Sequence, residues 1–422
     1  MCELLVGLPD VTVLGVVDGP VLVVHVESRG LPRSCLGCER TGWVRARSKV
    51  TLVDLPCFGR VTRLVWHKVR LSCPNPGCAM VSWTIEDARI APARMVLTDR
   101  AGRWVTEQVG RHGRTVNEVA GELACDWHTV NDAVLAYGEA LVDDDTGRVG
   151  TPMAVGLDET LFNRTGPFRT PSWSTAIVDV ANPRLLDLVE GRDAGPACRW
   201  FAARGPEWLA AIEWATLDMS GPYRKVFNTV LPHAVQIADP FHVCKLANAM
   251  LDEVRRRVQN QTLGHRGRRD DPLFRVRRKL AMAAERHTVE STAKLLALLA
   301  TGDPTGDVTI AWHAKEVVRA TYQHHDIETA RAWVDEIIVD FADRSCPPEV
   351  RRLGRTIRVW RDQIVAWHQA HLSNGPTEAI NNLTKRIKRA AFGFRTFRHF
   401  RVRALLYAGR PNWQLLATIT PR

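Results

Sequence analysis

Two closely spaced pairs of cysteines have the residue type and the spacing of a metal site. Two residues separate the members of the first pair and four separate those of the second, in segments rich in proline and glycine: Cys35, Cys38, Cys73 and Cys78. Thiolates on two such knuckles can converge on one tetrahedral ion, so we predict a structural Zn²⁺ site. His67 and Cys57 lie between the knuckles and are alternative ligands.

Carboxylates form a second group of candidates. Asp158, Asp218 and Asp239 each end a short apolar run that is typical of a buried strand. In open α/β sheets the chemistry takes place beyond the carboxyl ends of the strands, which is where these three side chains fall. Glu378 lies far along the chain, in the first turn of a predicted helix that Asn374 or Ser373 can cap. A helix that returns to the sheet would bring Glu378 to the same edge.

Cations gather after Glu378, and no acidic residue stands among them. The cations that we expect to contact DNA are Lys385, Arg386, Lys388, Arg389, Arg395, Arg398 and Arg401. Phe392, Phe394, Phe397 and Phe400 alternate with them. This pattern fits phosphate contacts combined with base stacking, although some of the rings must belong to the core. Residues 255–279 form an earlier basic stretch. It is as consistent with a solvated helix face as with a surface that binds a polyanion.

The N-terminal elements must position the cysteines. Residues 60–71 alternate between apolar and polar side chains as a strand does, and they connect the two knuckles. Together with the paired cysteines, this strand predicts a zinc ribbon.

Two short helices are predicted next, over residues 116–123 and about 127–137, from apolar residues at helical spacing. Thr115 is the expected cap of the first, with Glu118 as its capping-box partner. Such a pair is typical of a helix-turn-helix, whose second helix would enter a DNA major groove, although a helical hairpin without DNA contacts shows the same pattern. We expect its exposed face to consist of His128, Thr129, Asn131 and Asp132.

A second α/β region follows an acidic, glycine-containing linker at residues 142–150. The pattern predicts strands over 153–158, 173–180 and 184–190, a helix over 194–212, a strand over 213–218, a helix over 222–231 and a strand over 234–239. This order is that of the ribonuclease-H-like fold. Residues 241–371 are almost wholly helical in pattern and too long for one connection, so we predict an inserted helical subdomain before the final helix.

Composition limits the class of protein. The 422 residues carry a net charge of +11 and are 45% hydrophobic, which is ordinary for a globular protein of several domains. We find no apolar run long enough to span a bilayer and no signal peptide, and we expect a soluble intracellular protein. The sequence pI near 9.4 indicates a polyanionic partner.

Several strings carry a family resemblance over essentially the whole chain. They are Gly156-Leu-Asp-Glu159, Leu217-Asp-Met-Ser220 with Pro222-Tyr223, Asp239-Pro-Phe-His-Val243, and Ser373-Asn-Gly-Pro-Thr-Glu-Ala-Ile-Asn-Asn382 with Lys388-Arg389 and Phe392-Gly-Phe394. With these strings the sequence resembles the DDE transposases of bacterial insertion sequences, and most closely the ISL-three family.

The resemblance implies a catalytic triad of Asp158, Asp218 and Glu378, which would hold Mg²⁺ or Mn²⁺ for phosphodiester cleavage. Asp239 and His242 form an Asp-x-x-His signature and are the alternative or supporting residues. We favour Asp218 over Asp239 because the predicted topology places Asp218 on the strand expected to neighbour that of Asp158.

The implied function is that of a transposase that binds the terminal inverted repeats of its element, cuts the DNA and joins it to a target. The expected partners are double-stranded DNA and a second copy of the chain, in the bacterial cytoplasm at the nucleoid, with no membrane partner. Two alternatives stay open. One is a DNA-binding regulator without catalysis, and the other is a nuclease of the same fold without strand transfer.

These predictions divide the chain into six segments. They are a zinc-ribbon region (1–95), a helix-turn-helix region (96–141), a linker (142–150), the first part of a ribonuclease-H-like core (151–243), a helical insertion (244–371), and the C-terminal helix with a basic tail (372–422).

Overall fold

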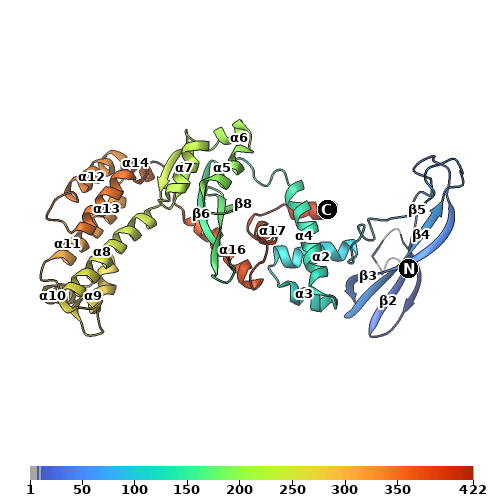
Figure 1. The fold of residues 1–422 in the computed structure, drawn as a ribbon, viewed down its shortest axis with the longest axis horizontal. Coiled ribbons are helices and arrows are strands. Elements are labelled where there is room, and N and C mark those ends of the chain that lie inside the picture. Colours follow the sequence, from blue (N-terminus) through green and yellow to red (C-terminus); the bar gives the residue numbers. More distant parts are fainter. Residues whose placement is uncertain (1–6, 9–10, 422) are drawn as a thin grey trace.

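The computed structural model describes residues 7–8 and 11–421. Within them the protein is an elongated mixed α/β chain with one sheet near its N-terminus, a second sheet near the middle and a helical region at the opposite end (Figure 1). None of the helices in this described part combines the length and the apolar character that crossing a bilayer requires.

The N-terminal sheet has the strand order β1-β2-β4-β3, with β5 paired to β4. Its strands are β1 (Val11–Val17), β2 (Val21–Ser28), β3 (Trp43–Cys57), β4 (Arg60–Ser72) and β5 (Ser82–Thr84). The long antiparallel pair of β3 and β4 closes through Phe58 and Gly59, whose φ angles of 52° and 72° suit a tight two-residue hairpin turn. The strand predicted over residues 60–71 is β4.

The helices α2 (Asp99–Thr106), α3 (Val116–Leu123) and α4 (Trp127–Asp144) follow, with a short π-helix, η1 (Glu107–Arg111), after α2. The predicted capping box of α3 is present: Thr115 accepts from the Glu118 amide, and the Glu118 side chain accepts from the Thr115 amide. Asp126 caps α4. This helix is longer than predicted and takes in the first three residues of the predicted linker, residues 142–144.

The central sheet has the order β10-β9-β6-β7-β8. Its elements are β6 (Ala154–Thr165), β7 (Thr170–Asp179), β8 (Arg184–Glu190), α5 (Ala194–Ala202), α6 (Pro206–Ala210), β9 (Trp214–Leu217), α7 (Gly221–Val230) and β10 (Val235–Ala238). Strands β6, β9 and β10 are parallel, and β7 is antiparallel to both β6 and β8. The predicted element order is present, except that the helix predicted over 194–212 is two helices separated at residues 203–205.

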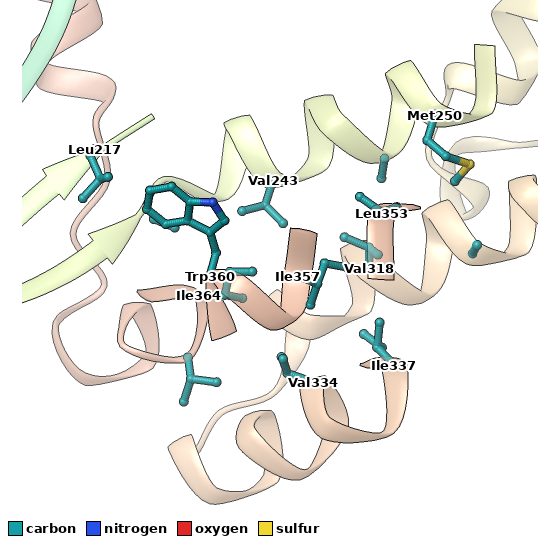
Figure 2. Close-up of a cluster of buried hydrophobic side chains, with 14 of the residues drawn as sticks. Leu217, Val243, Met250, Val318, Val334, Ile337, Leu353, Ile357, Trp360 and Ile364 are labelled. Carbon is teal, nitrogen blue, oxygen red and sulfur yellow. The ribbon is translucent and has the colours of Figure 1, made fainter. Parts of the chain in front are cut away.

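The helical insertion leaves the sheet directly after β10. It contains α8 (Pro240–Leu263), α9 (Pro272–Ala281), α10 (Val289–Gly302), α11 (Asp307–Ala320), α12 (Ile327–Asp340), α13 (Pro348–Val359), α14 (Arg361–Val365) and α15 (Trp367–Ala370), with short 3-10 turns η2 (Ala284–Arg286) and η3 (Thr321–Gln323). Figure 2 shows its core continuing from Leu217 on β9, past Trp360, along α8 to Met250. The insertion and the sheet therefore share one core.

The chain then returns to the sheet through α16 (Gly375–Ala390), α17 (Phe397–Ala408) and the 3-10 turn η4 (Trp413–Ala417). The two faces of the central sheet belong to different cores. Ile177 of β7 faces the core shared with the insertion, whereas Ala176 and Val178 face a core formed with α2, α3, α4, α16 and α17. The predicted helix-turn-helix thus packs in the same core as the C-terminal helices.

Candidate functional site

Two of the predicted carboxylates lie side by side because of the strand register. Gly156 of β6 pairs with Thr216 of the parallel strand β9. Asp158 stands two residues further along, within β6, and Asp218 stands two residues further along, just beyond the end of β9. Burial and the charge of Asp158 both raise the pKa of Asp218, so the two carboxylates are neighbours. Asp239 follows β10, one strand further out, and its amide donates to the Leu217 carbonyl.

Helix α16 is held against this edge by two asparagines. Asn381 Nδ2 donates to Asp158 Oδ2 at 2.7 Å. Seven residues earlier, the Asn374 amide donates to Asp239 Oδ1 at 3.0 Å, and Thr216 Oγ1 donates to Asn374 Oδ1 at 3.1 Å. Glu378 lies four residues after Asn374 and three before Asn381, so helical spacing places it on the face that these contacts hold against the sheet.

Asp218 is an unusual carboxylate. Its Oδ1 is buried and has no hydrogen-bond partner among the described residues. Burial, with the neighbouring charge of Asp158, raises the pKa of Asp218 above its ordinary value. Asp158 itself is bonded, because its Oδ1 accepts from the Glu159 amide at 2.8 Å and its Oδ2 from Asn381. A buried, unpartnered carboxylate beside a second one is costly unless a cation joins them.

Asp239 is engaged on both oxygens. Its Oδ1 accepts from the Asn374 amide, and its Oδ2 accepts from the amide of His242 and pairs with His242 Nδ1 at 2.9 Å. The hydrogen bond to Asp239 raises the pKa of His242. Asp239 therefore caps α8 and ties the start of the insertion to the start of α16.

The predicted triad carboxylates could bind divalent ions even though they do not form one tight cluster. Among the described residues, the three predicted triad carboxylates are not all within 4.8 Å of one another. In a two-metal site the ions lie about 3.5–4 Å apart. Carboxylates that bind different ions of the pair can therefore lie further from each other than ligands of a single ion. The unpartnered Oδ1 of Asp218 and the paired strand ends offer oxygen ligands of the kind that Mg²⁺ prefers.

The four predicted cysteines come together. Their Sγ atoms all lie within 4.8 Å of one another, with Cys35 Sγ 3.8 Å from Cys78 Sγ and Cys38 Sγ 3.5 Å from Cys73 Sγ. Four sulfurs around Zn²⁺ at about 2.3 Å lie about 3.8 Å apart, so the cluster has the dimensions of a zinc site. The open end of the β3–β4 hairpin holds it.

The alternative ligands lie elsewhere. Cys57 is at the far end of β3 from the cluster. His67 pairs with His25, with their ring nitrogens 3.1 Å apart, and it belongs to no metal-binding group in the described part of the chain.

The predicted exposed face of α4 is only partly exposed. His128 and Asp132 are exposed, and Thr129 is half-buried with its hydroxyl bonded to Asp126. The prediction that Asn131 is exposed is wrong, because Asn131 is only 7% exposed. Gly138, two helical turns further along the same face, packs against Val402 and Leu406 of α17. Pattern within α4 cannot show that α17 covers this face.

The C-terminal cations fall into two groups. Lys385, Arg386, Arg389 and Arg395 are exposed. Lys388 donates to the Leu161 carbonyl at 2.6 Å. Arg398 pairs with Glu139 of α4, and Arg401 Nε lies 2.7 Å from Asp187 Oδ1 of β8. In this structure these last two join elements of the protein, so a phosphate contact would require their ion pairs to break.

Comparison with known proteins places this site in a family. The family model of ISL3 DDE transposases, described as a transposase, matches residues 155–404. The chain belongs to the ISL3 family of DDE transposases. As predicted from the sequence, it is thus a DDE-type transposase, a polynucleotidyl transferase.

The transposase has relatives among characterised elements. The transposase for insertion sequence element IS1557 of Mycobacterium tuberculosis, in two strains, is 26% identical over 349 residues, 78% of this chain and 74% of that protein. The transposase for IS1001 of Bordetella parapertussis is 24% identical over 394 residues, 90% of each chain. The Drosophila P element transposase in its strand transfer complex aligns over 76% of this chain and 94% of that chain, with 7% identity and a TM-score of 0.40, too low to establish a shared fold.

Sequence reasoning missed the residues that bring α16 to the sheet. We expected Asn374 or Ser373 to cap the helix. Asn374 is at the cap position but its side chain makes no capping bond and contacts Thr216 instead, while the Ser373 hydroxyl accepts from the Gly375 amide. Asn381 stands in the string that carried the resemblance, yet only its contact with Asp158 shows its role.

Proposed function

We propose that this transposase binds the terminal inverted repeats of its insertion sequence and catalyses metal-dependent DNA cleavage and strand transfer. The catalytic core would be the ribonuclease-H-like sheet of residues 151–243, completed by the C-terminal helix of 372–422. Asp158, Asp218 and Glu378 would hold the ions, and Asp239 with His242 would support them. The relatives named for insertion sequences support this function.

The observation that carries the proposal is that Asp158 and Asp218 each stand two residues after a paired position of the parallel strands β6 and β9, with Asp218 Oδ1 buried and without a partner among the described residues. Two divalent ions bound there would neutralise the charge that develops on the attacking and leaving oxygens of the phosphodiester. Asn381 fixes the Asp158 carboxylate from α16, so the residues of the chain position these ligands before DNA arrives.

Recognition is assigned to two surfaces. The exposed His128 of α4, with Asp132 beside it, would contact base edges, and Thr129 would stay engaged with its capping aspartate. Lys385, Arg386, Arg389 and Arg395 would contact phosphates. We also propose that Zn²⁺ occupies the cysteine cluster. An insertion sequence has two DNA ends. The working complex at the bacterial nucleoid would therefore contain at least two copies of the chain.

Cleavage assays on pre-formed element ends test the proposed triad. Asp158→Ala, Asp218→Ala and Glu378→Ala should each lower Mg²⁺- or Mn²⁺-dependent cleavage by at least about 100-fold, because each loses a group that stabilises the transition state. Binding of end DNA should persist. Asp239→Ala should reduce cleavage less, since Asp239 follows β10, one strand further from Asp158 than Asp218 is, and its carboxylate caps α8.

Three outcomes would contradict the proposal. An active Asp218→Ala protein beside a folded but inactive Asp239→Ala protein would replace Asp218 by Asp239 in the triad. Pre-cut ends that are never joined to target DNA by the wild type would identify a nuclease without strand transfer. A protein that binds end DNA and cuts none of it with either metal would be a regulator.

A further inference from the structure

Two phenylalanines are exposed to a degree that is rare for large apolar side chains. Phe392, in the loop after α16, is 96% exposed, and Phe168, in the turn between β6 and β7, is 92% exposed. Val289 is the other large apolar side chain above 90% in the described part of the chain. The neighbouring Phe394, Phe397 and Phe400 pack into the core, so exposure singles out Phe392.

Both rings lie toward the same end of the central sheet. Helix α16 runs along β6, since Asn381 bonds to Asp158 and, seven residues later, Lys388 bonds to the carbonyl of Leu161 (Figure 1). Seven helical residues advance about 10 Å and three strand residues about the same, so the helix and the strand run in the same direction. The ring of Phe162 then contacts that of Phe397 at 5.6 Å, which fixes the loop to the strand.

The ring of Phe392 and the ring of Phe168 lie at similar distances from the carboxylates of the proposed triad. Phe392 follows Glu378 by fourteen residues, mostly helical, which is about 21 Å. Strand β6 continues seven residues beyond Asp158 before its turn, which is about 23 Å. At about 3.4 Å per stacked nucleotide, this span corresponds to about six or seven nucleotides.

Only cations flank the two rings. Arg164 and Arg169 flank Phe168, and Arg389 and Arg395 flank Phe392. All four are exposed, and none of them forms an ion pair within the described residues. Residues 160–172 and 379–403 contain no Asp or Glu. We call these six residues the aromatic tip.

We infer that the aromatic tip binds unpaired nucleotides, with Phe168 and Phe392 stacking on bases and the four arginines contacting the flanking phosphates. Every base offers a face on which an aromatic ring can stack, and a duplex hides those faces. A polyanion with accessible bases matches both the exposed rings and their charge. The inference rests on the proposed function, in that the nucleotides would be those about six or seven positions from the scissile phosphate.

Fluorescence anisotropy with the full chain tests this inference, using a labelled oligothymidine and a labelled blunt duplex at one salt concentration without divalent ions. Phe168→Ala and Phe392→Ala should each weaken oligothymidine binding by about 5- to 100-fold, the range for loss of one stacked base, with little change for the duplex. Phe392→Trp should retain binding. Phe58→Ala is the matched control, since Phe58 is also exposed on a hairpin turn but the nearby Arg60 pairs with Asp18.

Oligothymidine binding by both alanine variants at the wild-type level would overturn the inference and leave a protein partner as the occupant of the tip. Equal losses on oligothymidine and duplex would overturn it as well. The assay needs no cleavage. A chain that binds oligothymidine through the tip but cuts no DNA would contradict the proposed function alone, and a cutting chain with unaffected alanine variants would contradict this inference alone.

Discussion

Asp218 is a residue whose proposed function and contribution to stability oppose each other. Its buried carboxylate lacks a partner, and burial beside Asp158 raises its pKa. We expect Asp218→Asn to raise the free energy of unfolding by about 1 kcal/mol at neutral pH in metal-free buffer, because it removes a buried charge. Cleavage should be lost. Thermal melting of wild type and variant measures the difference.

The pH dependence has a defined sign. Because the folded pKa of Asp218 lies above its unfolded value near 3.8, the folded state holds the proton more tightly. Stability of the wild type therefore falls as pH rises from about the unfolded pKa through the folded pKa. The advantage of Asp218→Asn should grow over that window and vanish below it. A variant with a constant advantage at every pH would show that shape, and not charge, is responsible.

At the scale of elements, the approach of α16 to β6 depends on Gly156. A Cβ at this position would overlap Thr377 Oγ1 and lie 2.8 Å from both Thr216 Oγ1 and Val180 Cγ2. We expect Gly156→Ala to lower the free energy of unfolding by about 1–3 kcal/mol and to reduce cleavage strongly, because α16 and its Glu378 must move away. Chemical denaturation and cleavage rates measure both effects.

A matched glycine provides the control. Gly121 lies within α3, and a Cβ there would meet no heavy atom within 4 Å. Gly121→Ala should raise stability by about 0.5–1 kcal/mol and leave cleavage unchanged. If both substitutions left cleavage unchanged, the contact between α16 and β6 would not set the position of Glu378.

The proposed zinc site would join the two segments that flank the open end of the β3–β4 hairpin, so it belongs to the scale of elements. Cys35→Ser should lose close to one equivalent of zinc by elemental analysis and should expose the N-terminal sheet to protease, because metal binding is coupled to folding in such sites. Cys57→Ser changes a cysteine at the opposite end of β3 and should keep its zinc. Equal zinc contents in the two variants would exclude the cluster as the site.

Sequence patterns predicted the elements better than the contacts between them. Four of the five central strands were predicted within a few residues, since each is a short apolar run between turn residues. The exception is β6, which continues seven residues beyond the predicted end at Asp158. The order of helices and strands then predicted the sheet that brings Asp158 beside Asp218. Periodicity also predicted α3 with its capping box.

Long-range packing accounts for what the patterns did not predict. Asn131 is buried, and Gly138, two turns further along the same face of α4, packs against Val402 and Leu406 of the distant helix α17. The sequence predicted Arg401 as a free cation, but in the structure it pairs with Asp187 of β8. The break between α5 and α6 is different, because it has a local signal that the helical pattern overlooked: Gly205 is the N-cap of α6 and Pro206 is its first residue.

At the scale of the whole molecule, the predicted helix-turn-helix region is part of the core that the C-terminal helices complete. Buried residues of α2, α3 and α4 share that core with the sheet residues Ala176 and Val178 and with Leu406 of α17. Gly138 and Gly110 let Leu406 approach closely. The region for which we propose DNA recognition therefore packs directly on the sheet for which we propose catalysis.

We expect α4 and α17 to unfold together. Their core amides should show the same free energy of exchange in native-state hydrogen exchange, and a fragment of residues 96–150 should lack stable helical structure on its own. A folded fragment, or protection of α4 that outlasts that of α17, would instead show that the helix-turn-helix is an independent domain.

The insertion between β10 and α16 also sets the order in which the active site is made. Glu378 is translated 160 residues after Asp218, which at about 5–20 residues per second is on the order of ten to thirty seconds. Until then the nascent sheet carries two carboxylates without α16, and α4 lacks its partner α17. A chain released before α16 would lack Glu378 of the proposed triad, and its α4 would lack the helix that packs on it. Translation itself would thus delay the appearance of the proposed DNA-cutting activity until α16 and α17 have been synthesised.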